Sequence, residues 1–160
     1  MNYNLLILTC INQSVCIKKI FVLLVLLIGG AGSARAYCFA EAAKRFGLDE
    51  SLLRAIATTE NAKYDPALVV QIGQREYIGL MMVSTIWLPE LSRLGVTRES
   101  LKDACVNVLV GAYILKDAVR MYGLTWKAVG AYNTGVYSDN TDAQKRYIKK
   151  VWNNIKMRKR

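Results

Sequence analysis

One acidic residue falls on the face of its helix where an apolar residue is expected. Leu53, Ile56 and Ala57 recur at helical spacing, and Glu60 occupies the next step of this stripe. Burial disfavours the charged form of a carboxyl group, so we expect the pKa of Glu60 to be raised. A carboxyl group that keeps its proton near neutral pH can act as a general acid. In the alternative interpretation, Glu60 simply ends the helix and reaches water.

The remaining residue types limit the chemistry that can accompany this acid. The 160 residues include no His, which excludes Ser-His and Cys-His nucleophile pairs and His-ligated metal sites. We therefore expect no metal and no cofactor, and a reaction carried out by carboxylates, Tyr, Lys or hydroxyl groups. Asp65 is the nearest candidate for a second carboxylate, but its position directly before Pro66 is typical of a turn residue.

Helical patterns cover most of the chain around Glu60, and no alternating run reaches strand length. Turn residues and caps predict helices over 39–46, from 49–51 onward, and over 84–94, 97–102, 107–122, 126–133 and 143–156. Residues 61–83 contain Pro66, Gly73 and Gly79 and predict a long irregular loop, with a small hairpin as an option. Loops of this length in compact domains are usually functional. The sequence predicts an all-α, or nearly all-α, single domain with a long irregular active-site loop.

The first 36 residues have the pattern of a secretory signal peptide. Two lysines precede the apolar run 20–28, and the small-residue site Ala34-Arg35-Ala36 follows it. Nine apolar residues are too few to cross a bilayer, which needs about twenty. We therefore expect a signal peptide over 1–36, a mature domain over 37–160 and no stable membrane anchor after cleavage. An uncleaved anchor or a core helix are the alternatives.

Export would leave two cysteines in the mature chain, Cys38 and Cys105. Two cysteines in an exported protein most simply form one disulfide. Closing a loop of this length stabilises a fold by about 4 kcal/mol in the chain-entropy estimate. The alternative is a pair of buried free thiols.

The net charge of the chain also limits the classes of partner that it is expected to bind. The full chain carries a formal charge of +10, and residues 37–160 carry +7 because the first 36 contain three basic residues and no acid. A positive protein meets anionic polymers faster at low salt. The alternative is that the basic residues from Lys145 to Arg160 form a solvated tail. We expect no nucleic-acid partner, because export separates the protein from cytoplasmic nucleic acid.

Three short motifs, taken in order, resemble a known signature. Glu60, Gly-Leu-Met-Met at 79–82 and Ala-Tyr-Asn-Thr-Gly at 131–135 resemble the Glu-Ser, Gly-Leu-Met-Gln and Ala-Tyr-Asn-x-Gly motifs of the lysozyme-like soluble lytic transglycosylases. The resemblance covers about residues 37–152. It is closest to the small exported members that accompany secretion, conjugation and invasion systems, and it implies a lysozyme-like fold.

The resemblance assigns roles to individual residues. Glu60 matches the single catalytic acid. Gly79, Leu80 and Met81 match the wall of the glycan cleft, and Tyr132 and Asn133 match residues beside the acid. Met82 occupies the last position of the cleft-wall motif and is expected to contact substrate there. Core packing is the alternative role for Tyr132 and for the two methionines. Two positions depart from the family pattern, since Met82 replaces a Gln and Asn61 replaces a Ser. These departures affect expected rate and substrate preference more than reaction type.

The implied reaction is cleavage of peptidoglycan between N-acetylmuramic acid and N-acetylglucosamine with a 1,6-anhydro product. A conventional glycosidase needs a second carboxylate, whereas this family uses the acetamido group of the substrate. The implied setting is the periplasm, and the implied partners are glycan strands and components of a secretion, conjugation or pilus machine. The alternatives are a catalytically weak peptidoglycan-binding or assembly protein and a hydrolytic lysozyme.

Overall fold

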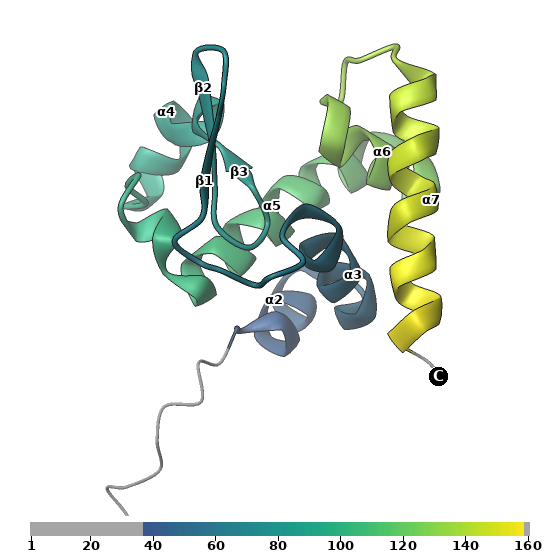
Figure 1. Ribbon diagram of the computed structural model, residues 1–160, viewed down its shortest axis with the longest axis horizontal. Coiled ribbons are helices and arrows are strands. Elements are labelled where there is room, and N and C mark those ends of the chain that lie inside the picture. The colour runs from purple at the N-terminus through teal and green to yellow at the C-terminus, as the bar shows by residue number, and fades with distance from the viewer. Residues whose placement is uncertain (1–36, 159–160) are drawn as a thin grey trace, which may run out of the picture. The chain divides into compact units, whose positions relative to one another are not determined.

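The computed structural model describes residues 37–158, and helices predominate within this range (Figure 1). The α-helices are α2 (Phe39–Phe46), α3 (Glu50–Glu60), α4 (Leu88–Leu91), α5 (Ala104–Tyr122), α6 (Trp126–Thr134) and α7 (Thr141–Arg158). This helix-rich architecture confirms the predicted fold class. The predicted signal peptide lies outside the described residues. Within residues 37–158, no helix combines the length and the hydropathy that a membrane span requires.

A small sheet occupies part of the segment that was expected to be irregular. Its strands are β1 (Val69–Ile72), β2 (Arg75–Ile78) and β3 (Val83–Ser84), paired antiparallel in the order β1-β2-β3. In register, Val69 lies opposite Ile78, and Tyr77 lies opposite Ser84. Strands of two to four residues are too short to show a period-2 pattern, so the sequence predicted at most a hairpin here.

Several predicted helix boundaries need correction. The expected helix over 97–102 is only a 3₁₀ turn (Ser100–Lys102). The expected helix over 84–94 is instead a strand end at Ser84, a 3₁₀ turn (Thr85–Trp87), α4 and a second 3₁₀ turn (Ser92–Leu94). Pro89 lies in the first turn of α4, where its missing N–H leaves no hydrogen bond unmade. Helix α5 begins at Ala104 rather than 107, because the Asp103 carboxylate caps it by accepting from the Val106 N–H. Helix α7 also extends beyond 143–156, to Thr141–Arg158.

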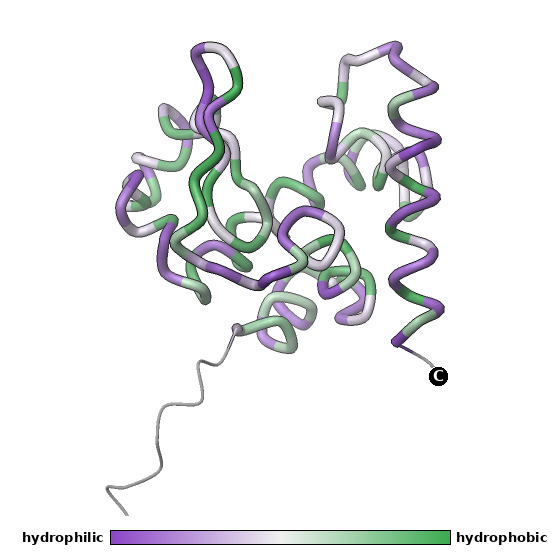
Figure 2. Tube along the Cα trace, viewed as in Figure 1, coloured by the Kyte–Doolittle hydropathy of each residue, from purple (hydrophilic) through white to green (hydrophobic). Residues whose placement is uncertain are grey.

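Helix α5 supplies the centre of the hydrophobic core. Its apolar stripe is fully buried at Val108, Ala112 and Leu115 and half-buried at Val119 and Tyr122. Helix α2 packs on α5, and α7 packs on both α3 and α6. In Figure 2, α7 is mostly hydrophilic, with hydrophobic positions recurring singly along it. This pattern fits a helix that lies on the surface and buries a single stripe.

The structure pairs Cys38 with Cys105 in a disulfide that joins the start of α2 to the first turn of α5. The predicted pairing is therefore confirmed, and the alternative of two free thiols is wrong for this structure. The bridge holds the N-terminal helix on the central one, across 67 residues of sequence.

Candidate active site

Glu60 is the last residue of α3, and the helix places it at the edge of a cleft. Leu53, Ile56 and Ala57 are all fully buried, so the apolar stripe predicted from the sequence exists. Glu60 continues this stripe and is half-buried. It lines a cleft of about 660 Å³. Glu60 therefore both ends its helix and remains largely shielded from bulk water.

The surroundings of Glu60 raise its pKa from the ordinary value of 4.5 to about 7. Burial is the main cause, because it disfavours the carboxylate. Two groups on α7 act in the opposite direction. The Tyr147 hydroxyl donates a hydrogen bond to Glu60 Oε1 at 2.6 Å, and the Lys150 ammonium attracts the negative charge. The result is a carboxyl group that holds its proton for much of the time near neutral pH and can also release it.

Tyr132 reaches into the same site from α6. Its hydroxyl donates to the backbone oxygen of Met81 at 2.7 Å, which ties α6 to the turn that follows β2. Burial, and then the nearby charge of Glu60, hold the pKa of Tyr132 well above its usual value. Tyr132 therefore stays a neutral hydroxyl beside the acid. Its neighbour Asn133 is exposed and lines the cleft.

The turn over residues 79–82 is held from behind by one buried amide, Asn107. Its Nδ2 donates to the backbone oxygens of Ile78 and Leu101 at 2.8 Å each. Its Oδ1 accepts from the Met81 N–H at 2.8 Å. Position 79 requires glycine, because its φ is +78° and a Cβ there would lie 2.3 Å from Asn107 Nδ2.

The four residues of this turn have different positions. Leu80 and Met81 are fully buried and belong to the core, with Met81 packed against Gly111 of α5. Gly79 lies behind the cleft with them. Met82 adopts a positive φ of 48° and lines the cleft. The structure thus brings Met82, Tyr132 and Asn133 together with Glu60, while Gly79, Leu80 and Met81 form the layer that supports the cleft wall.

Asn61, which departs from the family pattern, has a structural role in this chain. Its Nδ2 donates to the backbone oxygen of Asp65 at 2.7 Å and to that of Gly79 at 3.3 Å. This buried amide joins the end of α3 to the turn at 79–82. The Asp65 carboxylate accepts from the Ala67 N–H at 2.9 Å, as expected of a turn residue, and it does not line the cleft.

Two side chains at the site were not identified from the sequence. Tyr147 lies in the helix predicted over 143–156, where no functional role was assigned to it. Glu90 is an exposed carboxylate on α4 that lines the cleft and accepts a hydrogen bond from the Tyr113 hydroxyl. Glu90 has no distinguishing spacing in the sequence. Only the fold of the 84–94 segment brings it to the cleft.

Within residues 37–158, one group of side chains has its potential metal-ligating atoms close together: Cys38, Glu41 and Cys105. The disulfide occupies both sulfur atoms of this group. The cleft itself combines carboxylate, hydroxyl and amide groups with Arg75 on β2. These are groups suited to binding a polar polymer and to moving a proton.

The helix-rich domain with its small three-stranded sheet is consistent with a lysozyme-like fold. The comparison with known families agrees, since the transglycosylase SLT domain matches residues 37–155. The chain belongs to this family. It therefore has the peptidoglycan-acting, lytic transglycosylase type of domain.

The chain is also similar to several characterised relatives. It is 36% identical over 137 residues to the invasion protein IagB of Salmonella typhi, covering 85% of this chain and 86% of the relative. It is 35% identical to an Escherichia coli protein called X polypeptide, covering 81% and 76% of the two chains. It is 30% identical to the protein IpgF of Shigella flexneri, covering 74% and 78%.

Proposed function

We propose that this protein is a lytic transglycosylase in which Glu60 is the single catalytic acid and base. The proposal rests on the position of this carboxyl group and on its raised pKa. It lies on an open cleft, yet burial keeps its pKa at about 7. Within residues 37–158, the other carboxylate on the cleft, Glu90, is exposed. A shielded acid is the group that can protonate a leaving oxygen at near-neutral pH.

In the first step, protonated Glu60 donates its proton to the glycosidic oxygen between N-acetylmuramic acid and N-acetylglucosamine. The bond from C1 to that oxygen breaks, and the leaving sugar departs as an alcohol. The acetamido oxygen of the muramic acid residue shares electrons with C1 and stabilises the positive charge that develops there. No second carboxylate is required by this step.

In the second step, ionised Glu60 takes the proton from the 6-hydroxyl of the same sugar. The 6-oxygen bonds to C1 and displaces the acetamido oxygen, which closes a 1,6-anhydro ring without water. Between the two steps, the Tyr147 hydroxyl and the Lys150 ammonium stabilise the carboxylate. The proton that Glu60 takes from the 6-hydroxyl restores its protonated state, which completes the cycle without a further base.

Digestion of purified peptidoglycan sacculi tests the reaction. The soluble products are identified by mass, and we expect anhydro-muropeptides from the mature protein and none from Glu60→Gln. Products with reducing ends would indicate a hydrolytic lysozyme. Glu90 is the observation that supports this second candidate, because it supplies a second carboxylate on the cleft. Retained binding without any product would indicate a peptidoglycan-binding protein instead. The departures from the family pattern at Met82 and Asn61 would agree with that outcome.

The proposed setting is the periplasm, where local opening of the wall would let a secretion, conjugation or pilus apparatus pass. The similarity to an invasion protein supports this setting, as does the signal-peptide pattern over residues 1–36. N-terminal sequencing of the protein recovered from the periplasm should begin at Tyr37. Full-length protein in the cytosol would contradict the export proposal.

A further inference from the structure

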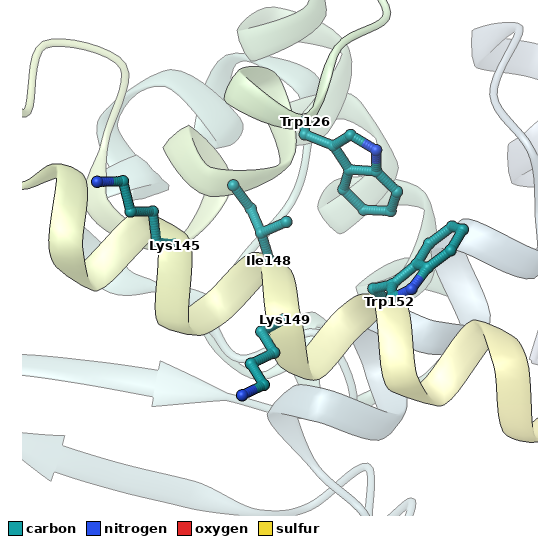
Figure 3. A pocket seen from close by; sticks show the side chains of 5 residues that line it. All are labelled: Trp126, Lys145, Ile148, Lys149 and Trp152. Atoms are coloured by element: carbon teal, nitrogen blue, oxygen red, sulfur yellow. The ribbon is translucent and has the colours of Figure 1, made fainter.

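A second hollow lies on α6 and α7, apart from the cleft that contains Glu60. It measures about 370 Å³ and is lined by Trp126, Lys145, Ile148, Lys149 and Trp152 (Figure 3). The two indole rings approach from different helices, with centroids 5.5 Å apart and planes at 89°. Both tryptophans remain exposed, at 40% and 46%. Large aromatic side chains that keep this much exposure are candidates for binding.

The geometry of α7 separates this hollow from the active site. Tyr147 is buried and bonds to Glu60, whereas Trp152 comes five residues later. At 3.6 residues per turn, this offset turns Trp152 by roughly 140° around the helix. The residues that line the hollow and those that line the cleft do not overlap. A ligand in the hollow would therefore leave Glu60 accessible.

The hollow combines apolar rings with positive charge. Lys145 and Lys149 line it from α7, and their ammonium groups extend away from the two indoles, so the positive charge lies around the hollow and not against the rings (Figure 3). The ammonium group of Lys156 lies 5.8 Å from the ring of Trp152. The Lys145 ammonium lies 3.9 Å from the Asp142 carboxylate, and both side chains are largely exposed. The site therefore suits a ligand that presents both apolar faces and carboxylates.

We propose that this tryptophan patch, made of the five lining residues and Lys156, is a second, non-catalytic binding site for the anionic glycan of peptidoglycan. The identity of the ligand rests on the proposed function. The ring and acetyl C–H groups of its sugars can pack on the indoles. Its lactyl and peptide carboxylates can accept hydrogen bonds from the lysines.

The size and shape of the patch favour this ligand over a protein or a membrane. A stable protein interface buries about 800 Å² on each partner, whereas two tryptophans and a few lysines offer a much smaller contact. A membrane-binding surface inserts its apolar side chains into the lipid, whereas here the indoles line a hollow. A repeating polymer can use a small site, because many equivalent units are offered at high local concentration.

The patch would hold the domain on the wall while the cleft engages a strand. Cleavage of intact sacculi should therefore depend on the patch, and cleavage of a short soluble fragment should not. Binding at one site raises the effective concentration at the other when both sites lie on one rigid domain. This dependence on polymer length separates the patch from the catalytic cleft.

The test compares two charge-reversed proteins, both carrying Glu60→Gln so that no turnover occurs. Lys145→Glu with Lys149→Glu changes the patch. Lys44→Glu with Arg93→Glu makes the same change in net charge at exposed positions outside it, on α2 and after α4. Binding is measured by sedimentation with purified sacculi. We expect the patch variant to bind roughly tenfold more weakly, as for loss of a main binding contact, and the control to bind as the parent does.

Further measurements test whether weaker binding to sacculi comes from the patch itself. Trp152→Ala should reproduce the loss of binding without any change in charge, with its fold checked by thermal unfolding. In the active background, the patch variant should cleave a soluble peptidoglycan tetrasaccharide normally and sacculi slowly. Equal sedimentation of the patch and control variants would overturn the proposal.

Loss of binding to phosphatidylglycerol vesicles alone, with sacculus binding unchanged, would also overturn the proposal, in favour of a membrane site. The sedimentation result does not depend on turnover. If the parent protein left sacculi uncleaved, the proposed function would fail, and the sedimentation assay would still decide whether the patch binds the wall.

Discussion

The cleft has two walls that hold their carboxylates in opposite ways. One wall is formed by the end of α3 and by α6, and its carboxylate, Glu60, is shielded and bonded by Tyr147. The other wall is formed by β2, β3 and α4, and its carboxylate, Glu90, is exposed. Burial raises the pKa of Glu60 to about 7. The contrast shows that the surroundings of a carboxyl group, and not its residue type, decide whether it can donate a proton.

A third acid strengthens the contrast. Glu76 on β2 makes two hydrogen bonds of 2.7 Å with the Arg98 guanidinium. This pairing lowers the pKa of Glu76 below its ordinary value. The strand that contributes to the second wall therefore carries an acid that stays ionised. The pKa values of Glu60 and Glu76 are therefore shifted in opposite directions by burial and by ion pairing.

The largest expected effect is on the α3 wall. Glu60→Gln should reduce cleavage of sacculi by roughly 10²–10⁴-fold, because Gln can neither donate nor accept the proton. The measurement is the rate of release of anhydro-muropeptides at fixed protein concentration. A variant that retained most of this activity would show that Glu60 is not the catalytic acid. The shielding of Glu60 compared with Glu90 would then be unrelated to catalysis.

The same substitution should have a smaller effect, of the opposite sign, on stability. The pKa of Glu60 is raised on folding, so the native state binds the proton more tightly than the unfolded state. The ionisation of Glu60 therefore leaves the free energy of unfolding unchanged below the ordinary pKa of 4.5 and lowers it by its full amount above about pH 7. Relative to the parent, Glu60→Gln should therefore gain stability as pH rises through that window, by up to about 3 kcal/mol.

Urea unfolding of the two proteins at pH 5 and at pH 8 measures this difference, since other titrating groups cancel between them. A constant difference across this range would mean that the pKa of Glu60 is not raised on folding. The surroundings of Glu60 would then not favour its protonated form.

Removal of the tyrosine contact should alter the pH dependence of cleavage. The Tyr147 hydroxyl stabilises ionised Glu60, so Tyr147→Phe should raise the pKa of Glu60 further. The decline of kcat/KM at high pH should move upward by about one pH unit. Tyr64→Phe is the matched control, because that hydroxyl bonds to Thr58 and to the Arg54 backbone oxygen on the same helix. An equal shift in the control would assign the effect to a general change in α3.

The smallest effect is expected on the opposite wall. Glu90→Gln should change the cleavage rate of sacculi by no more than a few-fold, because an exposed carboxylate is not needed as a second acid or base in this mechanism. Asp65→Asn should be similarly mild. A loss from Glu90→Gln as large as that from Glu60→Gln, together with reducing-end products, would instead indicate a two-carboxylate hydrolase.

Local features were predictable from the sequence because they depend on residues close together in the chain. The helical stripe of Leu53 and Ile56 placed Glu60 on a buried face, and the structure confirms that face. The turn role of Asp65 was also local. The predicted removal of residues 1–36 leaves one possible cysteine pair, so the disulfide could be predicted without knowledge of the fold. A small hairpin was only an option in the 61–83 segment, and the three-stranded sheet was not predicted, because runs of two to four residues carry too little periodicity.

The tertiary structure determined which residues from distant parts of the sequence contact one another. Tyr147 lies 87 residues from Glu60 in the chain, and only the packing of α7 on α3 makes it a hydrogen-bond donor to the acid. Glu90 reaches the cleft only because the 84–94 segment breaks into short turns. Met81 and Met82 are identical in type and adjacent in sequence, yet one is buried and the other faces the cleft. Burial and long-range contacts arise from the whole fold, so a local pattern cannot specify them.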